Sequence, residues 1–329
     1  MDRLTRLRYP SCHAARLSKG KIQVSKIVIL GVFVADTTYR ADRAPRIGET
    51  ILGRSFALGP GGKGSNQAVA AAMAGGDVHM ITRLGTDPFA DMALATWAKA
   101  GVNPAVTRHA DSYTGAAYIF VEHATGNNAI IICPGVASTI SPADIDARAD
   151  LIGGAAVFIT QLEQPMDAAL RALQIARAGG ACTVLNPAPA ATLPEGMLAL
   201  CDYVTPNESE AEALTGLPVT NVAEAEAAAR ALRKLGAGAV IITLGDKGAL
   251  YHDASQTVHV PVISAGPVVE TTGAGDAFNG GFATALAEGM DPVTAVRFGA
   301  ATAGISVTRP GTAPSMPARA EIDALLSAQ

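Results

Sequence analysis

The sequence alternates between short apolar runs rich in Val and Ile and longer segments with helical periodicity. Strands that alternate with helices of this length are typical of βαβ units, whose parallel sheet is covered on both faces. The sequence therefore predicts an α/β fold, a three-layer sandwich around a mostly parallel central sheet. The expected strands are 27–35, 78–85, 155–163, 182–186, 203–207 and 239–245, and the expected helices between them are 65–74, 89–101, 166–180 and 222–236.

Two strand-like runs, 114–122 and 128–133, break this rhythm because only a short turn at Gly126–Asn127 separates them. This pattern predicts a hairpin in a small antiparallel subdomain beside the main sheet. We expect its apolar side chains to be exposed, and so to cover a site or to pair with another subunit. Those side chains are Tyr118, Phe120, Ile130 and Ile132. The chain is expected to end in helices at 274–288, at 292–307 and from about 318.

Composition excludes several classes of protein. With 49% hydrophobic and 16% charged residues, the chain is too apolar to be disordered. A net charge of −4 argues against nucleic acid or an anionic membrane as a partner, and no run of 18 apolar residues predicts a membrane span. Four scattered cysteines form no C-x-x-C pair, so we expect no zinc site and a cytoplasmic location. Basic residues 1–25 are interpreted as a disordered extension or a misplaced start, with a transit peptide as the alternative.

The first dense glycine cluster is GPGGKGSN, residues 59–66. Its G-x-G-x-x-G spacing would suit a nucleotide-dependent oxidoreductase, but that fingerprint should directly follow the first strand, where Asp36 and Thr37 stand instead. It is not a P-loop either, because glycine follows Lys63. The cluster is therefore interpreted as a loop whose backbone approaches a ligand closely, with Lys63 and Asn66 at the start of a helix.

The second cluster, residues 270–280, places glycines before a helix whose first turn carries Asp276. The N–H groups from Gly273 to Asp276 and the helix dipole favour a bound anion. Ordinary helix capping would explain Asp276 alone but not the paired glycines. An anion hole beside a carboxylate suits phosphoryl transfer, because the carboxylate can accept the proton of the attacking hydroxyl.

The segments GGKGSNQAVAA (61–71) and TTGAGDAFNGG (271–281) closely resemble the two signatures of the ribokinase (PfkB-type) carbohydrate kinase family. The likeness extends over residues 26–329 and implies a ribokinase-like kinase domain. The resemblance implies a small β-sheet lid built from segments near 36–60 and 112–135, and a homodimer formed through that lid. It also implies transfer of the γ-phosphate of ATP to a primary hydroxyl of a small sugar, with D-ribose and its O5 expected first. Mg²⁺ and K⁺ are the implied metal ions.

The resemblance also implies a role for individual residues. Asp276 matches the catalytic base, and Gly273, Ala274 and Gly275 match the anion hole. The sugar-binding positions correspond to Val34, Asp36, Gly62, Lys63, Gly64, Asn66, Glu163 and Asp276. The nucleotide positions correspond to Asn207, Thr243, Gly245, Gly248, Gly275 and Ala300, with Glu210 acting on Mg²⁺ through phosphate or water. A monovalent-cation site corresponds to Glu270, Thr272, Ser306, Arg309, Gly311 and Ser315.

Two positions depart from the family pattern. Val34 stands where ribokinases generally have Asn, so one hydrogen-bonding group toward the sugar is replaced by apolar surface. Another sugar, a polyol or a nucleoside is therefore the alternative substrate. Glu270 stands where the cation loop usually has Asp, which puts potassium dependence in question. A non-catalytic sugar or nucleotide sensor should have lost the base or the glycines, and this chain keeps both.

Overall fold

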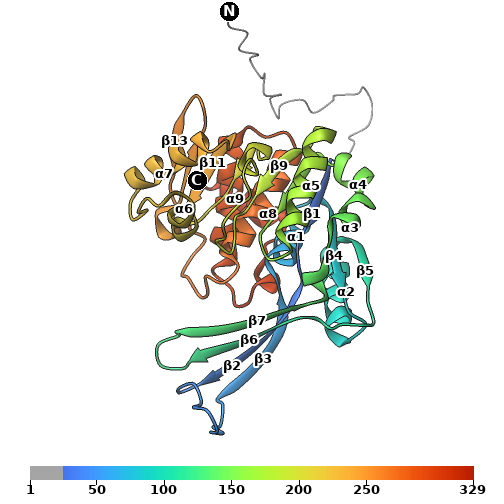
Figure 1. Ribbon diagram of the computed structural model, residues 1–329. Coiled ribbons are helices and arrows are strands. Elements are labelled where there is room, and N and C mark those ends of the chain that lie inside the picture. The colour runs from blue at the N-terminus through green and yellow to red at the C-terminus, as the bar shows by residue number, and fades with distance from the viewer. Residues whose placement is uncertain (1–24) are drawn as a thin grey trace, which may run out of the picture.

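The computed structural model describes residues 25–329 and confirms the predicted α/β fold (Figure 1). A nine-stranded central sheet is parallel at every pair of neighbours except β11–β12 and β12–β13. Across this sheet the strands are β13 (Thr257–Val260), β12 (Ala249–His252), β11 (Ala239–Thr243), β10 (Tyr203–Val204), β9 (Cys182–Leu185), β8 (Val157–Thr160), β1 (Lys26–Leu30), β4 (Asp77–Leu84) and β5 (Asn103–Arg108).

Helices cover both faces of the sheet, because side chains alternate along each strand and both faces of β1 are apolar. Ile27 and Ile29 join one buried cluster, whereas Val28 and Leu30 join the other. The first cluster includes residues of α1 (Lys63–Met73), α2 (Pro88–Ala100), α8 (Ala274–Ala287), α9 (Pro292–Ser306) and α10 (Arg319–Ser327). The second includes residues of α3 (Pro142–Asp146), α4 (Ala149–Gly153), α5 (Met166–Gly179), α6 (Glu208–Thr215) and α7 (Val222–Lys234).

A second sheet of four strands, here called the lid sheet, projects from the three-layer body (Figure 1). Its order is β3 (Ser55–Gly61), β2 (Val34–Ala41), β6 (Thr114–Glu122) and β7 (Asn128–Gly135). The predicted hairpin is β6–β7, but the expected antiparallel subdomain is mixed, because β2 runs parallel to β6. Tyr118, Ile130 and Ile132 are exposed as expected, whereas Phe120 is buried.

The predicted strand 27–35 is wrong as a single element. β1 ends at Leu30, and the chain crosses to the lid sheet before β2 begins at Val34. The run is apolar throughout because the crossing is also buried, with Val32 and Phe33 each 1% exposed. At the crossing, Gly31 packs against α1 so closely that an added Cβ would lie 2.7 Å from the Cα of Gly64.

Other predicted boundaries also shift. The strands expected at 155–163 and 203–207 shrink to β8 and β10, and the glycine loop at 59–64 is partly strand β3 followed directly by α1. Sequence reasoning missed β5, β12 and β13, which are short strands at the edges of the central sheet. The three C-terminal helices are present as α8, α9 and α10, and four short 3₁₀ helices complete the described part: η1 (Val136–Thr139), η2 (Leu198–Leu200), η3 (Gly245–Lys247) and η4 (Ala313–Ser315).

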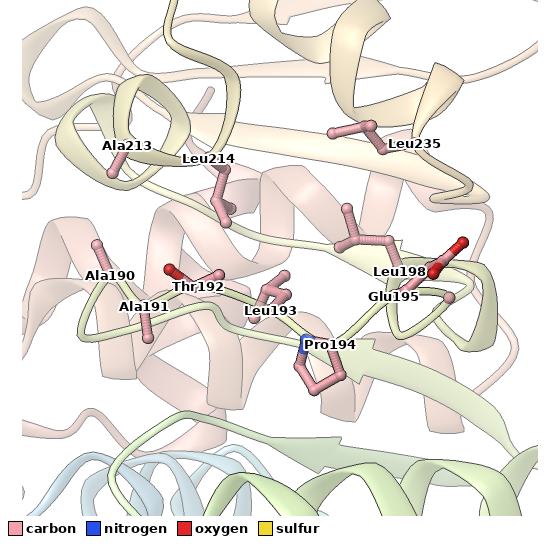
Figure 2. A pocket seen from close by; sticks show the side chains of 11 residues that line it. Ala190, Ala191, Thr192, Leu193, Pro194, Glu195, Leu198, Ala213, Leu214 and Leu235 are labelled. Atoms are coloured by element: carbon pink, nitrogen blue, oxygen red, sulfur yellow. The ribbon is translucent and has the colours of Figure 1, made fainter.

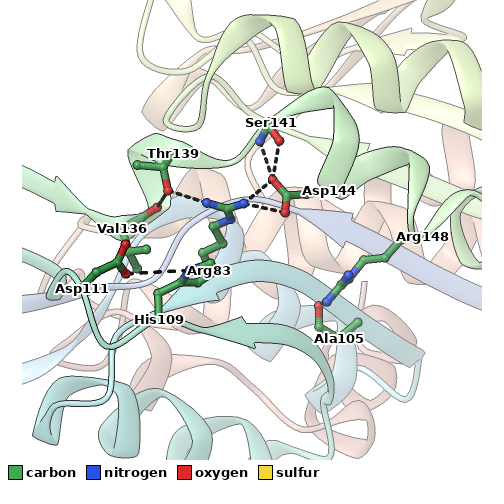
Figure 3. A network of polar contacts seen from close by, with 9 residues as sticks. All are labelled: Arg83, Ala105, His109, Asp111, Val136, Thr139, Ser141, Asp144 and Arg148. Atoms are coloured by element: carbon green, nitrogen blue, oxygen red, sulfur yellow. Dashed lines mark hydrogen bonds and ion pairs between the residues drawn. The ribbon is translucent and has the colours of Figure 1, made fainter.

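A polar network around Arg83 of β4 anchors the chain where it returns from the lid sheet (Figure 3). The Arg83 guanidinium donates to Thr139 Oγ1 at 2.7 Å, directly after β7, and to both carboxylate oxygens of Asp144 at 2.6 and 2.7 Å. Burial acts to raise the pKa of Asp144, but hydrogen bonds from Arg83 and Ser141 outweigh burial and lower it to about 2. An ionised pair therefore joins β4 to α3 beside the lid.

Apart from Ser25, the predicted N-terminal extension lies outside the described residues. Among residues 25–329, no helix combines the length and apolar character that crossing a membrane requires.

Candidate active site

A cavity of about 150 Å³ opens at the carboxyl edge of the central sheet beside the start of α8, and part of the predicted site residues line it. Asn186 follows β9, Thr205 follows β10 and Thr243 ends β11, and parallel strands bring these three positions to one edge. The full lining is Lys63, Asn186, Ala188, Thr205, Asn207, Glu210, Thr243, Thr271, Gly273, Ala274, Gly275, Asp276 and Asn279.

Asp276 lies in the first turn of α8 and is only 7% exposed. Both of its carboxylate oxygens accept hydrogen bonds from side-chain amides on α1. Asn66 Nδ2 donates to Oδ2 at 3.0 Å, and Gln67 Nε2 donates to Oδ1 at 3.1 Å. Burial raises the pKa of Asp276, while the charge of Lys63 and these two hydrogen bonds oppose that rise. The group is thus a buried carboxylate held in one orientation.

The predicted anion hole is partly used by the protein itself. Gly273 is the N-cap of α8 with φ of 82°, a left-handed conformation that favours glycine. The Ala274 N–H donates to the Thr271 carbonyl at 3.1 Å, so this predicted donor already has an acceptor. The amides of Gly275 and Asp276 lie in the first turn, where no carbonyl four residues earlier can accept within the helix. A Cβ added at Gly275 would meet nothing within 4 Å, and the residues from Gly273 to Asp276 all line the cavity.

Asp36 and Glu163 lie near Asp276, although neither lines the small cavity. Asp36 Oδ2 lies 2.1 Å from the place a Cβ at Gly61 would occupy, so Gly61 leaves room for this carboxylate. Burial, and then the charge of Asp276, raise the pKa of Asp36 to about 6. Glu163 Oε2 accepts from the Lys63 backbone N–H at 2.8 Å. Burial raises the pKa of Glu163 to about 7, against the opposing influence of Lys63.

The start of α1 completes this side of the site. Gly62 caps the helix with φ of 86°, and Gly64 allows the close contact with Gly31 described above. Asn66 Oδ1 is buried and has no hydrogen-bond partner among the described residues. A hydroxyl donor at this point would satisfy that acceptor, which is the kind of group a sugar supplies.

Val34 is the first residue of β2, not the end of the first strand of the central sheet. It pairs with Gly61 of β3 and Gly115 of β6, is 3% exposed and belongs to an apolar cluster. Because alternate residues of a strand share a face, Val34 and Asp36 still point to the same side of the lid sheet.

The nucleotide positions are brought together only in part. Asn207 and Glu210 form a capping box at α6: the Glu210 N–H donates to Asn207 Oδ1 at 2.8 Å, and the Asn207 N–H donates to Glu210 Oε2 at 2.9 Å. Thr243 lines the cavity, and Gly245 and Gly248 follow it with φ of 56° and 90°. Ala300 lies partly buried within α9 and is not among the cavity-lining residues.

The predicted cation positions lie on two segments that touch each other. Glu270 carboxylate accepts from the Gly311 N–H at 2.8 Å, and the Glu270 N–H donates to the Val307 carbonyl at 3.2 Å. The Ser306 and Ser315 hydroxyls donate to backbone carbonyls, while Arg309 pairs with Glu321. Thr272 is exposed. In residues 25–329, no three His, Cys, Asp or Glu side chains are grouped as a metal site.

A larger cavity of about 550 Å³ lies apart from these residues (Figure 2). It opens between the loop at 190–198, α6 and Leu235 beyond the end of α7, and most of its lining side chains are Ala, Leu or Pro. Thr192 and Glu195 are its polar side chains, so it lacks the converging titratable groups that surround Asp276.

Comparison with known proteins agrees with this geometry. The profile of the pfkB family carbohydrate kinases matches residues 24–319. The chain belongs to this family. A deoxyribokinase of Salmonella typhimurium is 37% identical over 303 residues, covering 92% of this chain and 98% of its own length. A ribokinase of Staphylococcus aureus is 36% identical over 302 residues, covering 91% and 99%.

Solved structures of the family share the fold of this chain. The Arabidopsis thaliana ribokinase complexed with ribose and ATP superposes with a TM-score of 0.86 at 30% identity, covering 92% of this chain and 99% of its own. The ribokinase of Thermotoga maritima gives a TM-score of 0.84 at 36% identity with the same coverage. The chain is therefore a PfkB-family carbohydrate kinase, as the sequence signatures predicted.

Sequence reasoning missed several polar residues of this candidate site. Asn186, Thr205 and Asn279 line the cavity, and Gln67 contacts Asp276 directly. Each of the first two follows an apolar strand, and Asn279 lies one turn after Asp276. The available signal was a polar side chain directly after a buried strand or on the helix turn that carries the carboxylate.

Glu163 should lower the stability of the ligand-free protein above neutral pH. Its folded pKa of about 7 exceeds the ordinary 4.5, so its favourable contribution is present below pH 4.5 and is lost as pH rises through 7. We expect Glu163→Gln to raise the free energy of unfolding at pH 8 by about 1–3 kcal/mol and to have little effect near pH 4.5. Urea unfolding at both pH values checks this, with the exposed Glu212→Gln as control. Destabilisation at pH 8 would contradict it.

Proposed function

We propose that this kinase transfers the γ-phosphate of ATP to the primary hydroxyl of a small sugar, with D-ribose and its O5 as the first candidate. One observation carries the proposal: the buried Asp276 carboxylate lies in the first turn of α8, where the amides of Gly275 and Asp276 have no acceptor within the helix and both residues line the cavity. Phosphoryl transfer needs both parts, a group that takes the proton of the hydroxyl and donors that offset negative charge on the moving phosphoryl group.

Asp276 acts as the general base in this mechanism. It accepts the proton of the sugar hydroxyl while the hydroxyl oxygen bonds to the γ-phosphorus and the bond from that phosphorus to ADP breaks. Asn66 and Gln67 hold the carboxylate from its two sides. The amides of Gly275 and Asp276 stabilise negative charge on the phosphoryl oxygens, and the left-handed Gly273 keeps the helix start open toward them.

The sugar lies between the lid sheet and α1 in this proposal. Asp36 and Glu163 accept hydrogen bonds from its hydroxyl groups, and the buried Asn66 Oδ1 accepts another. Gly62, Lys63 and Gly64 provide close backbone approach at the start of α1. The raised pKa values of Asp36 and Glu163 mean that both carboxylates gain from donors supplied by a ligand.

The nucleotide takes the cavity at the carboxyl edge of the sheet. Asn186, Asn207 and Thr243 offer polar groups to it there. Lys63 is the cation of this lining, whereas Asp276 and Glu210 are acids, so a triphosphate needs further positive charge. Mg²⁺ fits this donor set when it arrives with phosphate and water, because it usually keeps several waters and needs only one or two carboxylates. Glu210 is the carboxylate that we propose acts on Mg²⁺ through phosphate or water, because the helix cap uses only its Oε2.

A monovalent cation is a further part of the proposal. The touching segments 269–272 and 306–315 can offer backbone carbonyls, and K⁺ is bound by such oxygens. The Glu270 carboxylate, already held by the Gly311 amide, adds negative charge beside them. We also propose a cytoplasmic location, because the four scattered cysteines form no C-x-x-C pair and suit a reducing compartment.

Replacing Asp276 by Asn tests the base. The change keeps size and the surrounding packing but removes the proton acceptor, so kcat should fall about 10²–10⁴-fold while nucleotide affinity changes little. A coupled kinase assay and nucleotide titration by calorimetry measure the two quantities. A variant that keeps a tenth of wild-type turnover would refute the role of Asp276.

A 2-deoxypentose is the second candidate substrate, and Val34 favours it. Val34 shares a face of the lid sheet with Asp36 and lies in an apolar cluster, so it offers contact but no hydrogen bond. A sugar hydroxyl facing it would lose water without gaining a partner, at about 1–3 kcal/mol. A sugar that lacks one hydroxyl avoids this cost. The similarity to a deoxyribokinase is consistent with this reading.

Val34→Asn should therefore shift preference toward D-ribose. We expect the ratio of kcat/KM for D-ribose to that for 2-deoxy-D-ribose to rise about ten- to hundredfold. Because the ratio compares two sugars on one protein sample, partial misfolding does not affect it. Val34→Leu, which stays apolar, is the control and should leave the ratio unchanged. An unchanged ratio in Val34→Asn would show that this position carries no specificity.

The lid sheet also supports a homodimer. Residues paired directly across its strands share a face, so Thr37, Leu58, Tyr118 and Ile131 lie on the side opposite Asp36. Tyr39 and Phe56 extend this face. The ring centroid of Tyr39 lies 5.1 Å from that of Phe56 and 5.4 Å from that of Tyr118. These aromatic side chains are partly exposed, and a second copy of the lid would cover them.

Light scattering should find a dimer at micromolar concentration. Phe56→Glu places a charge within the exposed aromatic face, on edge strand β3, and should yield a monomer, because an unpaired charge is costly to bury. Leu235→Glu changes an equally exposed apolar residue outside the lid, at 56% against 58%, and should remain a dimer. A monomeric wild-type protein would exclude assembly through the lid.

A further inference from the structure

We propose that Gln67 is a positioning residue that holds the Asp276 carboxylate ionised and aimed, and that Gln161 sets the orientation of the Gln67 amide. This inference rests on the proposed role of Asp276 as the general base. It concerns two glutamines that do not contact the open cavity and that act on the reaction only through Asp276.

Gln67 lies on α1 and is completely buried. Its Nε2 donates to Asp276 Oδ1 at 3.1 Å and to Asn186 Oδ1 at 3.0 Å, so both amide hydrogens have acceptors. Its Oε1 accepts from Gln161 Nε2 at 2.6 Å. The amide nitrogen of Gln67 thus makes two hydrogen bonds and its amide oxygen makes one, all within the protein. These bonds hold the side chain in one orientation.

The direction of these hydrogen bonds follows from the charge of the base. An ionised carboxylate can only accept, so the group facing Asp276 must be the Gln67 NH₂. The Gln67 carbonyl then faces Gln161, which must present its own NH₂. A rotated Gln67 amide would bring oxygen against oxygen at both Asp276 and Asn186. Gln161 is fully buried just after β8 and blocks that rotation from the side remote from the carboxylate.

The network continues from Asn186 to the helix that carries the base. Asn186 Nδ2 donates to the Thr205 carbonyl at 3.0 Å, and Thr205 Oγ1 donates to Asn279 Oδ1 at 2.6 Å. Asn279 Nδ2 donates to the Gly275 carbonyl at 2.8 Å. Gln67 therefore connects the carboxylate with the first turn of α8, where the phosphoryl group is proposed to lie.

Other charged groups also act on Asp276 and must be separated from Gln67 in a test. Lys63 on α1 favours the ionised form, whereas Asp36 on β2, Glu163 after β8 and Glu210 on α6 are acids coupled to it by charge. None of these contacts depends on the Gln67 amide. A substitution at Gln67 that keeps volume removes the donor to Oδ1 and the link to Asn186 and, in Gln67→Met, also the acceptor for Gln161 Nε2.

The experiment measures kcat between pH 5 and 9 at saturating ATP and at saturating concentration of whichever pentose the wild type uses best. Gln67→Met keeps volume and removes the donor. We expect kcat on the plateau to fall about tenfold and the acidic midpoint of the profile to move up by about one pH unit, with both KM values within about threefold of wild type. The midpoint rises because losing a hydrogen bond to the charged form favours protonation.

Gln67→Glu retains the shape and the bond from Gln161 but places oxygen against Oδ1. Its acidic midpoint should move up further than that of Gln67→Met, because a second carboxyl favours protonation of the pair. Gln161→Met should shift the midpoint in the same direction by less. Gln164→Met is the matched control: this buried amide donates to Thr160 Oγ1 and to a backbone carbonyl and does not reach Asp276, so the midpoint should not move.

The outcomes separate this inference from the proposed function. If Asp276→Asn stays active, the base is misassigned and the positioning role falls with it. If Asp276→Asn is inactive while Gln67→Met and Gln67→Glu keep the wild-type midpoint, the function stands and the positioning role is wrong. An equal shift in Gln164→Met would also overturn it. If Gln67→Met does not fold, the isosteric Gln67→Glu decides by the same midpoint.

Discussion

The site depends on keeping one carboxylate buried at the start of a helix. Asp276 loses most of its hydration at 7% exposure, and without compensation it would become protonated. Compensation comes from α1, which supplies the amides of Asn66 and Gln67 and the charge of Lys63. Helices α1 and α8 must therefore pack closely. Gly280 makes this possible, since an added Cβ there would lie 2.5 Å from the Cβ of Ala70.

Burial acts on the other acidic side chains of the site as it does on Asp276. Burial raises the pKa of Asp36, Glu163, Glu210 and Asp276, and Lys63 is the cation that opposes this in the last three. Burial is thus only partly offset by the hydrogen bonds and the charge that the protein itself supplies to these carboxylates. In the proposed reaction, sugar hydroxyls and a metal ion carried with a triphosphate would supply further donors and positive charge. An electrostatically unfavourable empty site is thus consistent with strong differential binding of the reacting complex.

The sequence predicted the layers and the position of Asp276 because both depend on local patterns. Buried parallel strands are apolar along their whole length, and paired glycines before a carboxylate mark a helix start suited to an anion. Prediction from the sequence failed where contacts between distant segments of the chain determine the structure. The first part of the run 27–35 is buried in the central sheet and the last part in the lid sheet. The whole run is therefore apolar, and periodicity could not locate the crossing at Gly31. Ala274 was expected in the anion hole, but its amide bonds to Thr271. Gln67 carries no local signal, because its partners are 94 to 209 positions away in the chain.

Strand β2 combines two tasks that would otherwise need separate elements. On one face it carries Val34 and Asp36, which lie toward the proposed sugar, and on the other it carries Tyr39 within the exposed aromatic face. Because successive side chains of a strand point to opposite sides, a displacement of β2 moves both faces together. Covering Tyr39 by a second lid would therefore restrict the positions of Asp36, and hence how the sugar is held. In the proposed dimer, substrate choice and subunit assembly would be coupled through the backbone of one strand, whose entry into the lid is fixed by the close contact of Gly31 with Gly64.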